Sequence, residues 1–289
     1  MDALPVVMVA ISALLHAFWN LLAKEGENKE SFMWLMTLTS LFTVSPIFLL
    51  LVPDLSLPLE LLPILLISAV AETLYFITLS RAYSLGDLSL VYPLARSSPL
   101  YITILAVVFL GEEISLAGFL GIILTVVGVY MLHLRSLRLE EIFRPFREWG
   151  RASSYALLTA LWTTLYSLTD KIGVNRIDPV VYAFWLEPFI LVILTPTLTH
   201  MRGWSSMKSE WENSKLRVLA AGFLMRSGYI LVLLAMSLAP VSYILALRQV
   251  SVVIGAIIGI LFLEEGYGKI RVISSTIIFL GIYLLVALV

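Results

Sequence analysis

Long apolar runs, separated by short polar connections, follow one another along the whole chain. A helix needs about 20 mainly apolar residues to cross the roughly 30 Å hydrocarbon core of a bilayer. Because lipid offers the backbone no hydrogen-bond partners, such runs must be helical. The pattern predicts ten membrane-spanning helices, at about residues 4–23, 32–52, 62–84, 88–110, 114–134, 152–171, 178–199, 217–237, 240–262 and 268–288.

The same pattern occurs twice. The segment 85–113 has a second version at 238–265, and a shift of 153 positions superposes, among other matches, Ser89 on Ser242. Self-similarity over half of a chain indicates two copies of one structural unit. Five spans per copy is an odd number, so two fused copies must enter the membrane in opposite directions. This is the inverted-repeat arrangement of many secondary transporters.

The predicted fold class is therefore an all-α integral membrane protein, with ten transmembrane helices arranged as two inverted five-helix repeats. The predicted domains are residues 1–134 and 152–289, joined by a basic linker at 135–151. In this linker, basic residues alternate with Leu, Ile, Phe and Trp, which favours a helix lying in the headgroup region. A solvated linker is the alternative.

Composition and charge support a membrane protein. The chain is 60% hydrophobic and only 13% charged, whereas soluble domains carry about 25% charged residues. Cysteine is absent, which excludes disulfides, thiolate metal sites and cysteine nucleophiles. A net charge of −1 gives no indication of a nucleic-acid partner. The expected partners are the lipid bilayer and a small-molecule metabolite.

The lysines and arginines are unevenly divided between the two faces of the predicted bundle. Connections at one face hold most of them, whereas connections at the other face hold only Lys171 and Arg176. Because basic loops stay in the cytoplasm, the basic face is predicted to be cytoplasmic. Both termini are then predicted to lie outside.

The doubled pattern resembles the EamA unit of the drug/metabolite transporter superfamily. The shared features are an Ala-x-Ser-Leu turn, at 82–85 and 235–238, and a Phe-Leu-x-Glu ending, at 109–112 and 262–265. The resemblance covers nearly the whole chain. It implies a ten-span carrier of small polar metabolites, with a central cavity lined by the first, third and fourth spans of each half. Members of this family usually have cytoplasmic termini, which is the opposite of what the charge distribution predicts.

Charged residues in the middle of predicted spans are the clearest functional indication. Insertion scales place the cost of one such residue at about 2.5–3.5 kcal/mol, so each should face a cavity or a partner. These residues are Glu72, Arg96, Glu187, Arg226 and Arg248.

The five charges are predicted to have two kinds of role. Matching the third spans of the two halves places Glu72 opposite Arg226, as a structural ion pair or as a gating or coupling pair. Arg96 and Arg248 fall one position apart in the repeat alignment. They are candidates to bind a substrate carboxylate or phosphate, because a guanidinium suits planar anions; buried, satisfied arginines are the alternative. Glu187, which precedes a proline, is a candidate proton carrier or the partner of an arginine.

Further candidate substrate-binding residues are His16, Asn20, Trp19, Trp162, Tyr75 and Tyr229. His16 and Asn20 are four residues apart and so share a helix face. The tryptophans occupy matching places in the two halves, and the tyrosines combine an apolar body with a hydroxyl group. For each of these residues, packing in the core is the alternative role.

The favoured function is a secondary active transporter that moves a small polar, amphoteric or anionic metabolite, such as an amino acid, by alternating access. Proton coupling is part of this hypothesis. No phosphate-binding loop or metal-ligand spacing occurs, so neither a cofactor nor a metal is predicted. An intramembrane enzyme acting on lipids or isoprenoids is the alternative, followed by a channel-like or scaffolding protein. The Gly255-x-x-x-Gly259 motif permits close approach of two helices, but it is short and common and is therefore weak evidence for dimerisation. The chain is predicted to be a monomer or a homodimer.

The polar residues at the span ends are predicted to have structural roles. Glu112 and Glu113 are expected to mark a boundary and to favour the N-terminus of the next helix; Glu264 and Glu265 are expected to do the same in the second half. The neighbouring pair 170–171 is expected to be a solvated ion pair.

Overall fold

The computed structural model describes residues 2–24, 26–52, 54–86, 88–132, 134, 136, 138–147, 149–254 and 268–287. Every regular element within these described residues is helical. In the first half they are α1 (Ala3–Lys24), α2 (Lys29–Leu51), the 3-10 helix η1 (Leu59–Leu61), α3 (Leu62–Leu85), α4 (Leu88–Ala95), α5 (Ser98–Leu105), the π-helical η2 (Ala106–Leu110) and α6 (Leu116–Leu132).

The second half begins with two short helices that lie in the predicted linker. Its elements are α7 (Leu139–Ile142), α8 (Arg144–Arg147), α9 (Arg151–Val174), α10 (Pro179–Leu238), α11 (Val241–Leu247) and α13 (Gly268–Ala287). The helix α10 is interrupted at two residues with non-helical backbone angles, Gly203 (φ 76°) and Ser214 (φ −133°). Glycine adopts the positive φ at 203 without the steric cost that a Cβ would add.

Among the described residues, four helices are long and apolar enough to cross a membrane: Ala3–Ala23, Leu59–Ala82, Pro179–His200 and Gly203–Leu238. Shorter apolar helices accompany them at Ser98–Leu110, Leu116–Leu132, Val241–Ile254 and Val272–Ala287. The described part of the chain is therefore all-helical and rich in apolar helices, as the sequence predicts for a multi-pass membrane protein. The two glycines of the Gly-x-x-x-Gly motif, and Glu264 and Glu265, lie outside the described residues.

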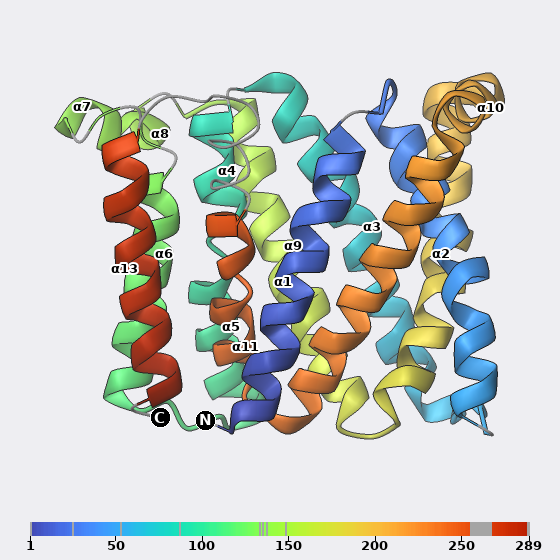
Figure 1. Ribbon diagram of the computed structural model, residues 1–289, viewed down its shortest axis with the longest axis horizontal. Coiled ribbons are helices and arrows are strands. Elements are labelled where there is room, and N and C mark those ends of the chain that lie inside the picture. Colours follow the sequence, from blue (N-terminus) through green and yellow to red (C-terminus); the bar gives the residue numbers. More distant parts are fainter. Residues whose placement is uncertain are drawn as a thin grey trace.

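The helices stand side by side, with α6 and α13 at one end of the bundle and α2 and part of α10 at the other (Figure 1). The start of α1 and the end of α13 lie at one face, and α7 and α8 lie at the opposite face. The most extensive packing joins α2 to α10, α3 to α9, α6 to α13 and α1 to α10. Each of these pairs combines a helix from the first half with one from the second, so the two halves interlock.

Small residues let some of these helices approach closely. A Cβ added to Gly121 of α6 would lie 2.7 Å from the carbonyl oxygen of Gly281 in α13. A Cβ added to Gly173 of α9 would clash with the ring of Tyr182. Lipid tails are as apolar as leucine, so association of helices in a membrane depends on such close packing.

Glu112 caps a helix, but this helix belongs to the other half of the chain. Its Oε1 accepts a hydrogen bond from the backbone N–H of Val241 (2.6 Å). Its Oε2 accepts hydrogen bonds from the hydroxyl (2.6 Å) and the backbone N–H (3.4 Å) of Ser242. A carboxylate at a helix N-terminus satisfies free N–H groups and opposes the positive end of the helix dipole. Glu112 is therefore a capping residue, but the prediction that it acts on the next helix is wrong, because the capped helix is α11 and not α6.

Candidate functional site

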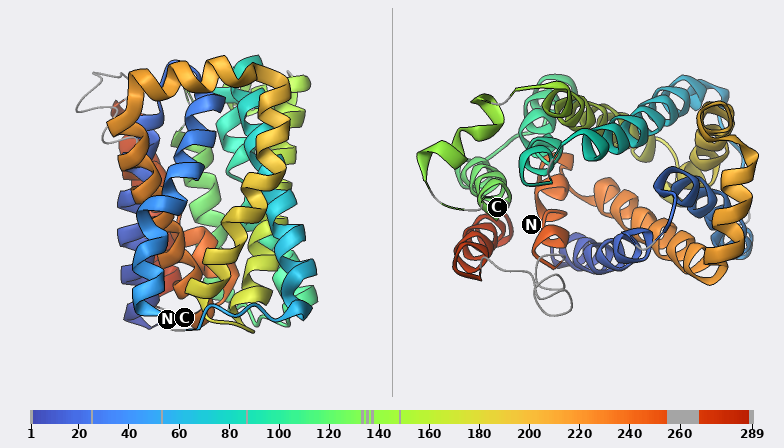
Figure 2. Two further views of the ribbon diagram at one scale, coloured as in Figure 1. Left: turned by 90° about the vertical axis from the view of Figure 1, so that its right-hand side faces the viewer. Right: turned by 90° about the horizontal axis from the view of Figure 1, so that it is seen from above.

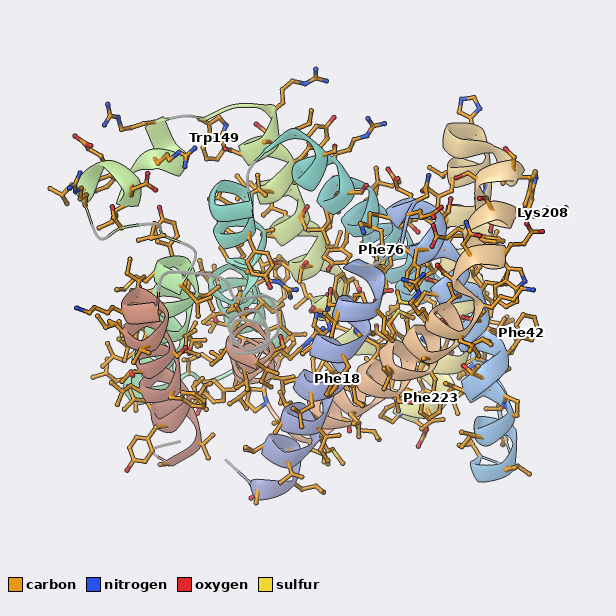
Figure 3. All side chains as sticks on the ribbon, turned by 45° about the horizontal axis from the view of Figure 1, so that its top comes forward. Phe18, Phe42, Phe76, Trp149, Lys208 and Phe223 are labelled. Atoms are coloured by element: carbon orange, nitrogen blue, oxygen red, sulfur yellow. The ribbon has the colours of Figure 1, made fainter. Side chains whose placement is uncertain are left out.

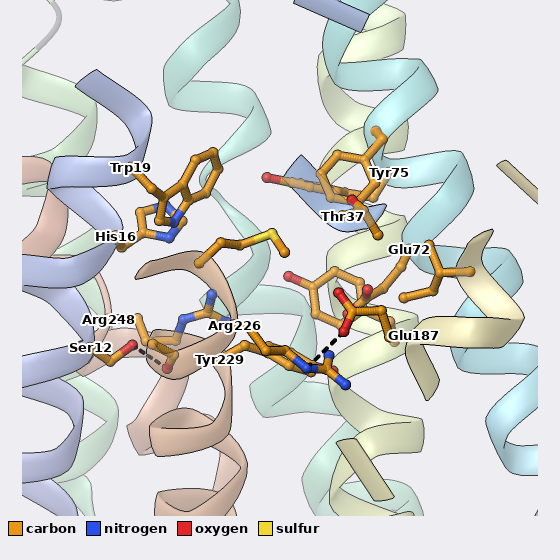
Figure 4. A pocket seen from close by; sticks show the side chains of 15 residues that line it. Ser12, His16, Trp19, Thr37, Glu72, Tyr75, Glu187, Arg226, Tyr229 and Arg248 are labelled. Atoms are coloured by element: carbon orange, nitrogen blue, oxygen red, sulfur yellow. Dashed lines mark hydrogen bonds and ion pairs between the residues drawn. The ribbon is translucent and has the colours of Figure 1, made fainter. Parts of the chain in front are cut away.

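A cavity of about 80 Å³ lies inside the bundle. Its lining comes from α1, α2, α3, α9, α10 and the end of α11: Ser12, His16, Trp19, Thr37, Glu72, Tyr75, Phe76, Tyr166, Glu187, Ile190, Met225, Arg226, Gly228, Tyr229 and Arg248. Figure 4 shows these side chains converging from the surrounding helices. Such a volume accommodates a few water molecules or a small polar group. The resemblance had implied the first, third and fourth spans of each half as the lining; Thr37 and Glu187 add α2 and the first part of α10.

Arginine and histidine side chains form the positively charged side of the site. Arg248 lines the cavity directly after the end of α11. It makes no side-chain hydrogen bond or ion pair with any of the residues that the structure describes. Arg96 does not line the cavity, but its Nη2 lies 3.4 Å from Nε2 of His16, which does. The ring of His16 is in turn packed edge-on against Trp19, at 4.8 Å between ring centroids.

The two predicted arginines stand at equivalent breaks in the backbone. The N–H of Arg96 bonds to the carbonyl of Tyr92 just past the end of α4, and the N–H of Arg248 bonds to that of Ile244 just past the end of α11. In each half, the N–H of the next residue bonds to the carbonyl three residues earlier: Ser97 to Leu94, and Gln249 to Ala246. These hydrogen bonds give Arg96 and Arg248 the same structural position in the two halves, whereas the repeat alignment of the sequence placed them one position apart. Interrupted helices are a common device for building polar sites inside membranes.

The prediction that Glu72 pairs with Arg226 is wrong. Arg226 pairs instead with Glu187, with 3.0 Å between Nε and Oε2, and both side chains are almost completely buried. Glu187 also accepts a hydrogen bond from Ser40, and Arg226 donates one to the carbonyl of Ala183. Glu72 lines the cavity and forms no ion pair with a described residue.

Sequence reasoning missed a second buried carboxylate. Asp170, expected to be solvated, is 0% exposed. It accepts hydrogen bonds from three hydroxyl groups: Ser68 (2.5 Å), Tyr182 (2.9 Å) and Tyr229 (2.6 Å). The expected ion pair with Lys171 does not form, because Lys171 donates to the carbonyls of Met236 and Ala239 instead.

Two features place Asp170 inside the protein. The span containing it was predicted to end at about residue 171, but α9 continues to Val174. Asp170 therefore stands within the helix rather than at its end. Its hydrogen bond to Tyr229, a cavity-lining residue, links this network to the site.

Most of the predicted site residues gather around one cavity. Those that line it are His16, Trp19, Glu72, Tyr75, Glu187, Arg226, Tyr229 and Arg248. Trp162 is only half-buried on α9 and does not line the cavity. Asn20 is exposed and donates its amide to the carbonyl of His16 (2.7 Å), which is a bond within the helix.

Little in the sequence indicated that the remaining lining residues face the cavity. Tyr166 packs edge-on against Tyr75, at 5.8 Å between ring centroids, so aromatic rings from α9 and α3 meet at the cavity. Ser12 donates a hydrogen bond to the carbonyl of Gly228 (2.7 Å) and joins α1 to α10. Single serines, threonines and aromatic residues are common in membrane helices, and only their packing shows which of them face the cavity.

A family model places this arrangement among known proteins. The model of the EamA-like transporter family matches residues 3–134 and again residues 150–287. The chain belongs to the EamA-like transporter family. The family match covers both of the predicted repeats and agrees with the resemblance noted in the sequence.

Two individual proteins are similar to this EamA-like chain. An uncharacterized transporter from Archaeoglobus fulgidus is 26% identical over 243 residues, which cover 81% of this chain and 79% of the relative. A protein solved by crystallography superposes with a TM-score of 0.76 over 98% of both chains, at 16% sequence identity. This second similarity shows a common fold alone.

Family membership and the apolar helices make the chain a membrane-embedded, multi-pass transporter. The alternative of an intramembrane enzyme gains no support, because the family is one of transporters. Within the part of the chain that the structure describes, no group of three or more His, Cys, Asp or Glu residues could hold a metal ion.

Proposed function

We propose that this EamA-like protein is a secondary active transporter, which moves a small amphoteric or anionic metabolite across the membrane by alternating access. In this proposal, ten spans form two inverted five-helix repeats, at 1–134 and 152–289. The double family match and the equivalent backbone breaks at Arg96 and Arg248 support the repeats. The interlocked packing of the two halves supports a site between them.

The observation that carries the proposal is the guanidinium of Arg248. It lines the cavity and has no hydrogen-bond or ion-pair partner among the described residues. Arg248 is partly buried, and a charge removed from water is costly unless it is paired, so this group is suited to receive an anion. A planar carboxylate accepts two parallel N–H bonds from a guanidinium.

The cavity also offers an acidic group at some distance from this arginine. Glu72 comes from α3, and Figure 4 shows it on the opposite side of the cavity from Arg248. Opposite charges on two sides of one cavity suit a zwitterion, whose ammonium group would lie toward Glu72. The aromatic rings of Trp19, Tyr75 and Tyr166 would contact its apolar part. An amino acid or a related compound has this combination of groups.

Replacing Arg248 by alanine is expected to reduce the flux of a labelled amino acid into proteoliposomes by about 10- to 100-fold. A hydrogen bond to a charged group contributes about 1.5–3 kcal/mol, and each 1.4 kcal/mol is about tenfold in affinity. The exposed Arg176→Ala variant is the matched control and should transport normally. Counterflow of labelled substrate separates a carrier from a channel. Unchanged flux in Arg248→Ala would contradict the proposed anion site.

Proton coupling is the proposed energy source, with Glu72 as the first candidate carrier because it lines the cavity without an ion pair to a described residue. In the same liposomes, an imposed pH gradient should then drive accumulation of the amino acid, and a proton ionophore should abolish it. Accumulation that survives the ionophore would remove this part of the proposal.

The basic face of the bundle is proposed to be cytoplasmic and both termini to lie outside. Lys208, Lys215 and the linker residue Arg144 belong to connections on the face opposite the start of α1. Cytoplasmic connections are enriched in such residues. A reporter enzyme that is active only in the cytoplasm, fused after the last residue, should therefore be silent. Activity of this fusion would reverse the orientation.

A further inference from the structure

Between the two breaks in α10, the segment 204–213 forms a helical stretch of its own. It lies across the top of the bundle at the end where α2 and α10 pack together (Figure 2). In the sequence, it falls in the connection between the spans predicted at 178–199 and 217–237. Its position and its two different faces indicate a binding surface separate from the central cavity.

One face of this segment is fixed to the turn between α1 and α2. Oε2 of Glu210 accepts the backbone N–H of Asn28 (2.7 Å), and the hydroxyl groups of Ser206 and Ser31 lie 3.0 Å apart. The amide of Asn213 donates to Glu27 (3.2 Å). Glu210 is 1% exposed. The segment is therefore held at a defined height over α2.

The other face carries residues at the helical spacing of 204, 207, 208 and 211. With Ser205 and two residues of α2, they line a groove of about 400 Å³: Trp34, Leu35, Trp204, Ser205, Met207, Lys208 and Trp211. Trp34 and Trp204 meet edge-on, at 5.7 Å between ring centroids, and the indole N–H of Trp34 bonds to Thr195 (2.9 Å). Trp204 remains 61% exposed. The groove is apolar, and Lys208 is the one charged residue among the described residues that line it.

Lys208 projects from the side of the bundle (Figure 3). Its pairing with Glu212 is loose, at 3.9 Å, and both side chains are largely exposed. An exposed pair of this kind contributes between about 0 and 1 kcal/mol. Lys208 is consequently available to an anion that enters the groove, and none of the described residues that line the groove with it is acidic.

We propose that this groove binds a phospholipid with a net negative headgroup. Its acyl chain would lie along Trp204 and Trp211, over the nearly buried Trp34 and Met207, with the phosphate on Lys208. Tryptophans concentrate at the membrane–water interface, and basic residues there attract anionic lipids by roughly 1 kcal/mol each. The charge of Lys208 disfavours the choline group of a zwitterionic lipid, and so selects for an anionic one.

The test uses the purified full-length protein in detergent, titrated with phosphatidylglycerol or phosphatidylcholine of identical acyl chains. Phosphatidylglycerol should raise the Tm by several degrees, because a ligand that binds only the folded state stabilises it. Lys208→Gln and Trp204→Ala should each remove most of this shift. Both residues are exposed, so the variants should fold normally. Lys215→Gln, an exposed lysine on the same face outside the groove, is the matched control.

Native mass spectrometry provides a second readout. It should detect one retained phosphatidylglycerol in the parent protein and none in Lys208→Gln. An equal shift with phosphatidylcholine would overturn the proposal in favour of ordinary boundary lipid. So would an equal shift with inorganic phosphate alone, a full shift in Lys208→Gln, or a groove-dependent dimer in place of a lipid adduct.

Discussion

Replacement of Arg226 by methionine is expected to destabilise the folded protein by about 3–5 kcal/mol. Arg226 is the ion-pair partner of Glu187, and the two side chains are 4% and 2% exposed. Without the arginine, the Glu187 carboxylate stays buried, and the Ser40 hydroxyl is its one remaining hydrogen-bond donor among the residues that the structure describes. Removing one partner of a buried pair costs far more than removing both, because it leaves one charge uncompensated.

Thermal unfolding in detergent measures this effect, and a double-mutant cycle separates the pair from the individual side chains. The double variant Arg226→Met with Glu187→Met should recover much of the lost stability. Its transport should stay low, since both residues line the cavity. Glu212→Ala is the control, because it breaks an exposed pair whose atoms are 3.9 Å apart and should change stability little. A double variant no more stable than Arg226→Met would show that the ion pair is not the cause.

Replacement of Asp170 by alanine is expected to cost about 3 kcal/mol or more. Three hydroxyl groups, from Ser68, Tyr182 and Tyr229, lose their acceptor at once. A buried polar group left without a partner costs about 1–3 kcal/mol. Asparagine should cost less, because its amide oxygen can still accept from Ser68 and Tyr182, and its NH₂ group can donate to the Tyr229 oxygen.

The two substitutions at Asp170 separate fold from function. Asp170→Asn should keep a cooperative unfolding transition but reduce amino-acid flux, since the bond that orients Tyr229 at the cavity is reversed in direction. Asp178→Ala is the matched control. This aspartate caps the N-terminus of α10 by accepting from Val180 (2.8 Å), and its loss should cost only about 1 kcal/mol. Equal stability losses in Asp170→Ala and Asp170→Asn would mean that the negative charge matters, and not the number of acceptors.

The cap that Glu112 places on α11 adds a link between the halves. The carboxylate comes from the end of the fourth predicted span, and the helix it caps opens the ninth. In an alternating-access cycle, the two halves must separate on one side of the membrane at a time. A contact that joins them at the face of the termini is therefore one of those that such a cycle would have to break.

The sequence alone determined the class of this protein. Apolar runs of about 20 residues can only be helices in lipid, and the doubled pattern indicated a repeated unit. The cost of burying a charge singled out five residues as facing a cavity or a partner. The structure places Glu72, Glu187, Arg226 and Arg248 around one cavity, whereas Arg96 lies outside the lining, beside His16. These inferences succeed because they depend on composition along the chain and on solvation, which are local properties.

The pairing of these charges was decided only by the tertiary structure. Several spans are apolar on all sides, so no hydrophobic stripe indicates which face of the helix points inward. Whether Arg226 meets Glu72 or Glu187 depends on how α10 is rotated and folded back against α3, α2 and its own first part. The burial of Asp170 likewise requires Ser68 and Tyr182 to arrive from two other helical segments. Hydrogen bonds and ion pairs act over about 3 Å, and sequence periodicity does not fix helix positions to that distance.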